Sequence, residues 1–146
     1  MSIQIKYKRL CPEAKAPRRA TEGSAGYDLY CVKRVLDEEH NALIYHTGLA
    51  FEIPHGHVGL LFPRSSIYKL PLFMPYSVGV IDSDYRGEVL AIFKDVDYGN
   101  LEPNYSVGER CCQLLIVELP TLLWKEVKTL SVTERGEGGH GSTGVK

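Results

Sequence analysis

Apolar residues fall in short stretches along this chain, and most stretches have the length and composition of β-strands. Residues 3–7 alternate apolar and polar side chains, as a half-buried strand does. We predict strands at residues 3–7, 42–45, 49–53, 58–62, 89–93, 111–119 and 122–130, and an irregular or edge segment at 70–75. Residues 122–130 also suit a short helix by composition, and we favour a strand because Val127 and Thr129 are β-branched.

Turn residues separate these stretches about every eight to twelve residues, and no long amphipathic helix interrupts them. This spacing predicts an all-β sandwich or barrel rather than a fold of alternating strands and helices. The chain shows no internal repeat and no linker between domains. We therefore expect a single β domain.

Residues 79–93 have the pattern of a β-hairpin. An apolar run ends at Ile81, a compact polar turn follows, and a second apolar run begins at Val89. The predicted tip carries two carboxylates, a phenol and a guanidinium, from Asp82, Asp84, Tyr85 and Arg86. A plain hairpin tip needs Gly, Asn or Asp for its backbone angles, but it does not need Tyr and Arg. The segment is either an acidic surface turn or part of a functional site.

The chain has 146 residues, of which 44% are hydrophobic and 24% charged, and its net charge is −1. Such a chain has no bulk positive field for nucleic acid or an anionic membrane, so a polyanionic ligand would need locally placed arginines. We expect no stable nucleic-acid binding and no membrane association. The N-terminus lacks the apolar core of a secretory signal, and no stretch approaches the ~20 apolar residues of a membrane helix.

The cysteines and histidines suggest no metal centre. The four cysteines form no C-x-x-C pair, so we expect reduced thiols, an intracellular reducing compartment, and no zinc site. Cys111 and Cys112 are adjacent, and on a strand they would point to opposite faces. The histidines at positions 40, 46, 55 and 57 are expected in solvated loops.

Two further segments bring oxygen and guanidinium groups to strand ends. Asp28 lies near a strand start in residues 23–30, where its carboxylate could hold a metal-bound water, and Mg²⁺ prefers oxygen ligands and keeps several waters. Arg64, Ser65 and Ser66 end another strand, and their side chains and amides could grip phosphate. Both segments also fit ordinary turns.

Two later segments are also ambiguous. Gln113 lies on the strand that follows the turn at residue 108, beside a run that looks buried on both faces. The tail at residues 135–144 combines Arg135 with closely spaced glycines, a ring and two hydroxyls, which would let its backbone approach phosphate. The alternatives are a solvent-facing Gln and a disordered glycine linker. The tail has neither the P-loop nor the Rossmann spacing, so both are excluded.

Together the five segments resemble the five ordered motifs of the trimeric dUTP pyrophosphatases (dUTPases). The motifs here are Ala25-Gly26-Tyr27-Asp28-Leu29, Pro63-Arg64-Ser65-Ser66, residues 79–89, Gly108-Glu109-Arg110-Cys111-Cys112-Gln113-Leu114 and residues 135–144. Each is weak alone, but the full set is specific and spans nearly the whole chain. The resemblance implies a jelly-roll-like β-barrel or sandwich, and a homotrimer with active sites shared between subunits. It also implies a β-barrel core at 1–134 and a flexible arm at 135–146 that closes over the site.

The resemblance also implies a role for each motif. Asp82 would orient and deprotonate the attacking water, Tyr85 would pack on deoxyribose and exclude a 2′-hydroxyl, and Asp28 would hold Mg²⁺ through water. The implied catalytic residues are Asp82, Tyr85, Gln113 and Arg135. The implied substrate contacts are Arg64, Ser65, Ser66 and Gln113 at the phosphates, Tyr85 at the sugar, the backbone of Gly79, Val80 and Ile81 at the uracil, and Arg135, His140, Gly141, Ser142 and Thr143 from the arm.

The implied reaction is Mg²⁺-assisted hydrolysis of dUTP to dUMP and pyrophosphate by water attack on the α-phosphorus. Such an enzyme limits uracil incorporation into DNA and supplies dUMP for dTMP synthesis. Three positions depart from the family pattern: Ser66 replaces a usual Gly, Tyr76 a usual Asn, and His140 a common Phe.

Two rival functions remain on the same fold. The related dCTP deaminases share an Arg-Ser-Ser motif, but they typically carry Gly-Trp-Glu where this chain has Asp84-Tyr85-Arg86. Glu88 is displaced by two residues from their glutamate. A non-catalytic nucleotide sensor is the other alternative, and the presence of Asp82, Tyr85 and Arg135 argues against it.

Overall fold

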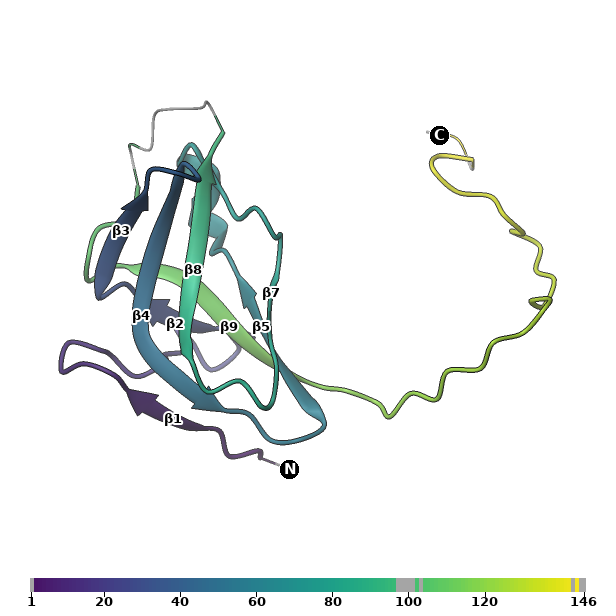
Figure 1. The fold of residues 1–146 in the computed structure, drawn as a ribbon, viewed down its shortest axis with the longest axis horizontal. Coiled ribbons are helices and arrows are strands. Elements are labelled where there is room, and N and C mark those ends of the chain that lie inside the picture. Colours follow the sequence, from purple (N-terminus) through teal and green to yellow (C-terminus); the bar gives the residue numbers. More distant parts are fainter. Residues whose placement is uncertain (1, 97–101, 103, 143, 145–146) are drawn as a thin grey trace.

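A computed structural model describes residues 2–96, 102, 104–142 and 144, which form two packed antiparallel sheets and an extended C-terminal arm (Figure 1). The first sheet has the order β1 (Lys6–Arg9), β4 (Ala42–Glu52), β8 (Glu88–Asp95) and β6 (Leu72–Phe73), with β3 (Lys33–Asp37) also paired to β4. The second has the order β2 (Tyr27–Tyr30), β9 (Arg110–Glu118), β5 (His57–Phe62) and β7 (Gly79–Ile81). A 3₁₀ helix, η1 (Ser65–Lys69), follows β5. This architecture confirms the predicted all-β, jelly-roll-like class.

The core lies between the two sheets, and β8 shows why the sequence folds this way. Its side chains alternate between half-buried and buried along the whole strand, because successive residues point to opposite faces. Phe93 points inward and packs edge-on against Tyr45 and Tyr105, with ring centroids 5.6 and 6.2 Å away. This aromatic cluster closes the core beneath η1.

Several strand predictions need correction. The two strands expected at 42–45 and 49–53 are one strand, β4, which is irregular between His46 and Ala50. Gly48 makes this possible, since its φ of +66° is a conformation that glycine adopts without strain. The first strand is shifted to Lys6–Arg9, and β3 was not predicted. Part of the polar loop at 97–104 lies outside the described residues.

The predicted hairpin at 79–93 is wrong in its pairing. β7 pairs with β5 in the second sheet, whereas β8 pairs with β4 and β6 in the first. The polar segment at 82–87 therefore crosses from one sheet to the other at the lower end of β8 in Figure 1. The local pattern was read correctly as strand, turn and strand, but the strands bind different neighbours.

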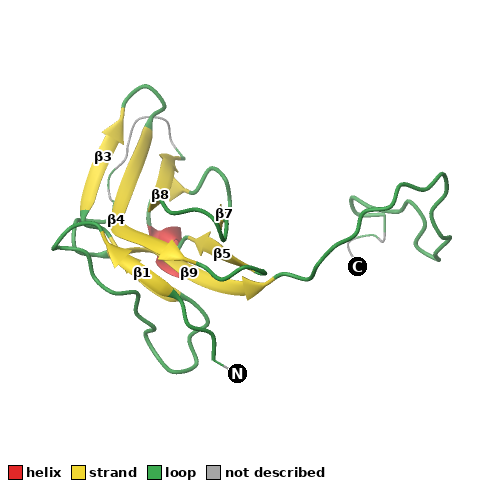
Figure 2. Cartoon of the chain, turned by 60° about the horizontal axis from the view of Figure 1, so that its bottom comes forward, coloured by secondary structure: helices red, strands yellow, loops and turns green. Residues whose placement is uncertain are grey.

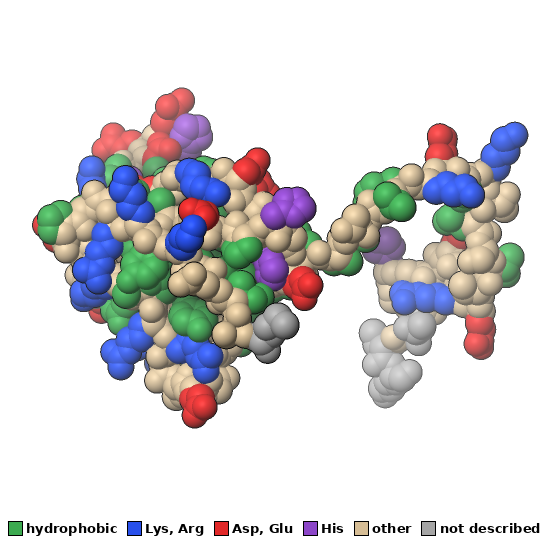
Figure 3. Space-filling model, turned by 90° about the horizontal axis from the view of Figure 1, so that it is seen from below, with side chains coloured by type: hydrophobic (Ala, Val, Ile, Leu, Met, Phe, Trp, Pro, Cys, Tyr) green, Lys and Arg blue, Asp and Glu red, His purple; other side chains and the backbone are tan. Residues whose placement is uncertain are grey.

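The predicted strand at 122–130 is also wrong, because the chain after β9 is irregular and exposed. Figures 2 and 3 show this arm leaving the sandwich and running away from it. Its large side chains include Leu123, Trp124, Leu130 and Val132, which are 82–98% exposed. The arm has no neighbour within the described chain against which a strand could form. In the described part of the chain, no helix has the length and apolarity needed to cross a bilayer.

Candidate active site

An open cleft of about 620 Å³ lies where β2, β9 and the end of β5 meet. Its lining brings together three of the five motifs, through Ala25, Gly26, Asp28, Arg64, Ser65 and Gln113. These residues come from distant parts of the sequence, and the sheet order joins them because β2 pairs with β9 and β9 with β5. The cleft therefore gathers four of the residues predicted to bind phosphate or metal, Asp28, Arg64, Ser65 and Gln113.

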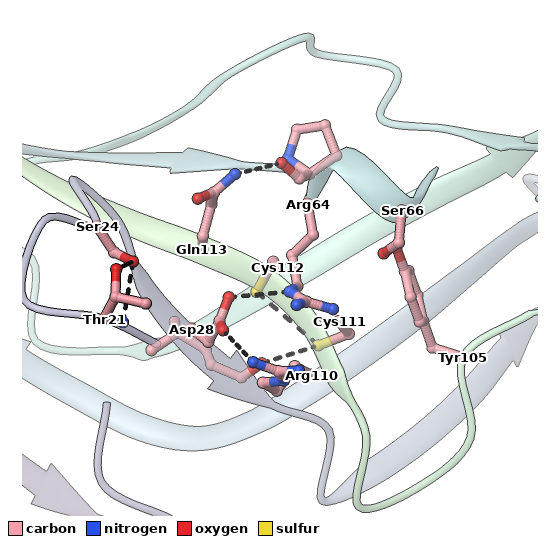
Figure 4. Close-up of polar contacts among 12 residues, drawn as sticks. Thr21, Ser24, Asp28, Arg64, Ser66, Tyr105, Arg110, Cys111, Cys112 and Gln113 are labelled. Carbon is pink, nitrogen blue, oxygen red and sulfur yellow. Dashed lines mark hydrogen bonds and ion pairs between the residues drawn. The ribbon is translucent and has the colours of Figure 1, made fainter. Parts of the chain in front are cut away.

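Asp28 lies at the centre of this group and is only 7% exposed (Figure 4). The Nε of Arg64 donates to its Oδ1 at 2.9 Å, and an Nη of Arg110 donates to its Oδ2 at 2.8 Å. A buried carboxylate needs such partners, because losing water without them is costly. Two guanidinium groups against one carboxylate leave a net positive charge beside the cleft, which suits a polyanion. Arg110 lies within the fourth motif, although the sequence alone predicts no role for it.

The expected metal role of Asp28 is restricted by these ion pairs. Among the described residues, no cluster of three or more His, Cys, Asp or Glu side chains could hold a metal ion directly. An ionised carboxylate accepts about four hydrogen bonds, and Arg64 and Arg110 take two of them. The remaining lone pairs fit a metal-bound water, so Asp28 suits outer-sphere contact only.

Gln113 lies on β9 beside the loop that ends β5. Its Nε2 donates to the carbonyl of Pro63 at 3.0 Å (Figure 4), which ties the strand to the Arg64 loop. A Cβ on Gly26 would meet the Gln113 Oε1, so a larger residue there would have to displace this amide. The first, second and fourth motifs thus meet at the side-chain amide of Gln113.

The two serines of the second motif face different surroundings. Ser65 is exposed and lines the cleft. Ser66, by contrast, has its hydroxyl 3.0 Å from the hydroxyl of Tyr105 (Figure 4), against the aromatic core. Burial raises the pKa of the Tyr105 phenol, which keeps it protonated and able to donate. The predicted phosphate role therefore suits Ser65, while Ser66 holds η1 onto the core.

The crossover loop at 82–87 holds the residues expected to perform the chemistry, and it does not line the cleft of the same chain. Asp82 is exposed, and its carbonyl accepts the N–H of Tyr85 at 3.1 Å. The Tyr85 hydroxyl donates to the carbonyl of Glu88 at 2.9 Å. Arg86 braces the turn by donating to two carbonyls, at 2.7 and 3.0 Å. The loop is thus a fixed turn that presents a carboxylate and a ring to solvent.

The strand before this loop carries the predicted uracil-reading backbone. Gly79, Val80 and Ile81 form β7, which pairs with Gly59, Leu60 and Leu61 of β5 on one side. β7 is the last strand in the order of its sheet, and Val80 is 62% exposed. An edge strand offers unpaired backbone groups, which suit hydrogen bonding to a base.

The arm residues lie far from the cleft in the described chain. Arg135 makes a local turn, in which its Nε donates to the carbonyl of Gly138 at 2.9 Å. His140 and Gly141 follow with φ of +51° and +86°, and Ser142 is exposed. Thr143 lies outside the described residues. The structure therefore does not bring the fifth motif to the other four within one chain.

Sequence reasoning also misplaced two histidines. His46 lies within β4 rather than in a loop, half-buried, with its Nδ1 3.0 Å from Glu88 Oε2. His57 begins β5, and its Nε2 is buried without a hydrogen-bond partner among the described residues. No local signal marked His46, because its partner Glu88 lies 42 positions away in the chain.

Comparison with known proteins identifies the family. The dUTPase family model matches residues 12–144. This chain belongs to the dUTPase family. The deoxyuridine 5′-triphosphate nucleotidohydrolase of Corynebacterium diphtheriae is 40% identical over 146 residues, covering 97% of this chain and 93% of that protein. The corresponding enzyme of Swinepox virus is 37% identical, covering 99% and 100%.

Solved dUTPase structures confirm the fold. The dUTPase of Staphylococcus bacteriophage 80alpha with dUpNHpp has a TM-score of 0.84 and 30% identity, covering 99% of this chain and 100% of that one. A mutant dUTPase of phage phi11 of S. aureus, whose structure shows coordination of a structural Mg(II) ion, has a TM-score of 0.73 and 24% identity, covering 87% and 98%. The recognised dUTPase motifs therefore lie on a dUTPase fold.

Proposed function

We propose that this protein hydrolyses dUTP to dUMP and pyrophosphate. The observation that carries the proposal is the cleft lined by Asp28, Arg64, Ser65 and Gln113. Asp28 pairs there with Arg64 and, beside the lining, with Arg110. Full-length relatives named dUTP nucleotidohydrolases, and a similar phage enzyme with a dUTP analogue, support this substrate. The absence of a Gly-Trp-Glu sequence at 84–86 disfavours deamination of dCTP.

The cleft residues, together with Arg110 beside them, would bind the triphosphate. Arg64 and Arg110 would neutralise its charge, and the Ser65 hydroxyl would donate near the α–β bridge. Asp28 would fix both guanidinium groups before the substrate arrives, so little reorganisation remains at the moment of reaction. Positioning and charge neutralisation are the main contributions that a protein makes to phosphoryl transfer.

Asp82 would act as the general base. Its carboxylate takes a proton from water while the water oxygen bonds to the α-phosphorus. The bond from that phosphorus to the bridging oxygen breaks, and pyrophosphate leaves. Tyr85, held by its bond to the Glu88 carbonyl, would lie against deoxyribose and leave no room for a 2′-hydroxyl. The edge backbone of Gly79, Val80 and Ile81 would read the uracil.

Mg²⁺ fits this site through water at Asp28. When bound, the ion would neutralise part of the triphosphate charge. Gln113 and Arg135 would complete the phosphate contacts, with His140, Gly141, Ser142 and Thr143 closing over the nucleotide. These arm contacts require the arm to fold onto a body when substrate is present.

We also propose that the active protein is a homotrimer with shared sites. The cleft and the Asp82 loop are separate surfaces of one chain, and the arm reaches neither. A neighbouring copy could supply each missing part. The exposed apolar side chains of the arm, such as Leu123 and Trp124, are typical of a segment that packs on a partner. Light scattering should then give three times the chain mass of 16.3 kDa.

In the cell, this activity would limit uracil incorporation into DNA and supply dUMP for dTMP synthesis. The four free cysteines fit the intracellular reducing compartment that we expect for it.

The Asp82→Asn variant tests the proposed reaction. It should lower turnover by about 1000-fold or more, because the general base is lost, while dUTP binding persists. Asp84→Asn is the matched control, since Asp84 is an exposed carboxylate on the same loop with no assigned role. Full turnover by Asp82→Asn would refute the role of Asp82. Binding of dUTP by the wild-type protein without turnover would favour the sensor alternative.

A further inference from the structure

The irregular part of β4 lies directly against the start of β8, just after the crossover loop. His46 is paired with Leu90 and Ala50 with Glu88, so residues 47–49 of β4 face the single residue Val89. This bulge bends β4, as Figure 1 shows. The bulge has its own hydrogen bonds: Thr47 Oγ1 donates to the Val89 carbonyl at 2.7 Å and accepts the Leu49 N–H at 3.2 Å.

The side chain of Glu88 supplies the remaining contacts of the bulge. Its Oε1 accepts the N–H of Gly48 at 2.8 Å, and its Oε2 lies 3.0 Å from Nδ1 of His46. Both side chains of this pair are about three-quarters buried, with 26% exposure for His46 and 24% for Glu88. Both carboxylate oxygens are therefore engaged, and Glu88 has little rotational freedom.

The backbone of the same residue holds Tyr85. The Tyr85 hydroxyl donates to the Glu88 carbonyl, which places the ring across Gly87. A Cβ at position 87 would collide with that hydroxyl, so the ring fits closely against the chain. Glu88 thus connects β4, through its side chain, with the ring of Tyr85, through its carbonyl. Glu88 is the first residue of β8, where it pairs with Ala50, so its side-chain contacts anchor the end of the strand at which this carbonyl lies.

We propose that Glu88 is a positioning residue for sugar selectivity. Its contacts with Gly48 and His46 fix the carbonyl that orients the Tyr85 ring, and the ring then rejects the 2′-hydroxyl of UTP. This inference rests on the proposed dUTPase function. Glu88 contacts no substrate in this account and acts only through Tyr85.

The test compares Glu88→Ala and Glu88→Gln with the wild-type protein, using kcat/KM for dUTP and for UTP. Glu88→Ala removes both side-chain contacts, and the preference for dUTP should fall about fivefold or more, as expected for one lost hydrogen-bonded constraint. Glu88→Gln keeps an acceptor for Gly48 and a polar group for His46, so it should restore most of the preference. The control is Asp37→Asn, which weakens another His–carboxylate contact, the exposed pair with His40 at the opposite end of the sheet.

A purely structural role would give a different result. Loss of folded protein would lower kcat/KM for both nucleotides equally and leave their ratio unchanged. Glu88→Ala should still fold, because an open cleft of about 410 Å³ beside Gly48 and His46 lets water solvate the freed groups. An unchanged ratio in folded Glu88→Ala would overturn the proposal.

A second measurement does not depend on activity. The NMR signal of the Tyr85 phenol carbon, labelled with ¹³C and assigned with Tyr85→Phe, reports the hydrogen bond without nucleotide. It should shift or broaden in Glu88→Ala but not in Asp37→Asn. An unmoved signal would refute the link between Glu88 and Tyr85. If the signal moves but the wild-type protein does not hydrolyse dUTP, the link stands and the proposed function fails.

Discussion

The Nε of Arg64 lies 2.9 Å from Oδ1 of Asp28, although the two residues are 36 positions apart in the chain. Arg110, 82 positions from Asp28, holds the other carboxylate oxygen at 2.8 Å. One buried acid thus orders two arginines from two different motifs. This arrangement makes Asp28 a structural centre of the cleft as well as a candidate for water-mediated metal binding.

Asp28→Asn should therefore destabilise the protein as well as weaken phosphate binding. The neutral amide cannot balance two partly buried guanidinium groups, and breaking such a pair costs about 3 kcal/mol. Urea denaturation would measure the loss. Glu52→Gln, at an exposed ion pair with Lys6, should change stability by less than about 1 kcal/mol. Equal stability of Asp28→Asn and the wild-type protein would contradict this view of the ion pairs.

Removing the end of the arm, residues 135–146, should separate folding from activity. A chain ending at Glu134 lacks the fifth motif, whose residues are exposed and pack on nothing in the described body. Its thermal midpoint should stay close to that of the full chain. Its kcat/KM for dUTP should fall about 100-fold or more, because the arm donors and the lid are lost. Glu137→Gln controls for general changes to the arm, and full activity of the truncated chain would refute the lid.

The buried thiols should make the protein sensitive to alkaline pH. Burial raises the pKa of Cys31 from 9.0 to about 12, with Cys111 nearby as a second cause. The hydrogen bond with Cys111 and burial also raise the pKa of Cys112. Between about pH 9 and pH 12, the Cys31 thiol is deprotonated in the unfolded chain but still protonated in the folded chain. Stability is therefore full below about pH 9 and falls as pH rises toward 12.

Urea midpoints taken between about pH 8 and pH 10.5 would measure this slope. Cys31→Ala should make the fall shallower, because one raised pKa is removed. The control is Cys11→Ala, at a thiol that is only partly buried, and it should leave the slope unchanged. Identical slopes for Cys31→Ala and the wild-type protein would show that the Cys31 thiol does not contribute.

The sequence predicted those parts of the fold that depend on neighbouring residues. The strands at 58–62, 89–93 and 111–119 were placed nearly correctly, because alternation and flanking turns are local properties. The choice of strand partner is not local. The run from Gly79 to Phe93 reads as a hairpin, yet β7 and β8 bind different sheets. Residues 122–130 have strand composition but no neighbour in one chain.

In the site, too, local motifs could be predicted from the sequence and contacts between distant residues could not. The motifs that contain Asp28, Arg64 and Gln113 were recognised from the sequence, and the structure brings them into one cleft. Two supporting contacts join distant residues: Ser66 contacts Tyr105 across 39 positions, and Glu88 contacts Gly48 across 40. No local sequence pattern predicts either contact. Such supporting residues become visible only when the sheets are assembled.

The most direct test of the central claim is a substrate panel. Pyrophosphate release would be measured with dUTP, dCTP, dTTP and UTP in the presence of Mg²⁺, with ammonia followed in parallel. We expect rapid release from dUTP, little from the other three, and no ammonia. Ammonia from dCTP, or dUTP binding without pyrophosphate release, would contradict the proposed function.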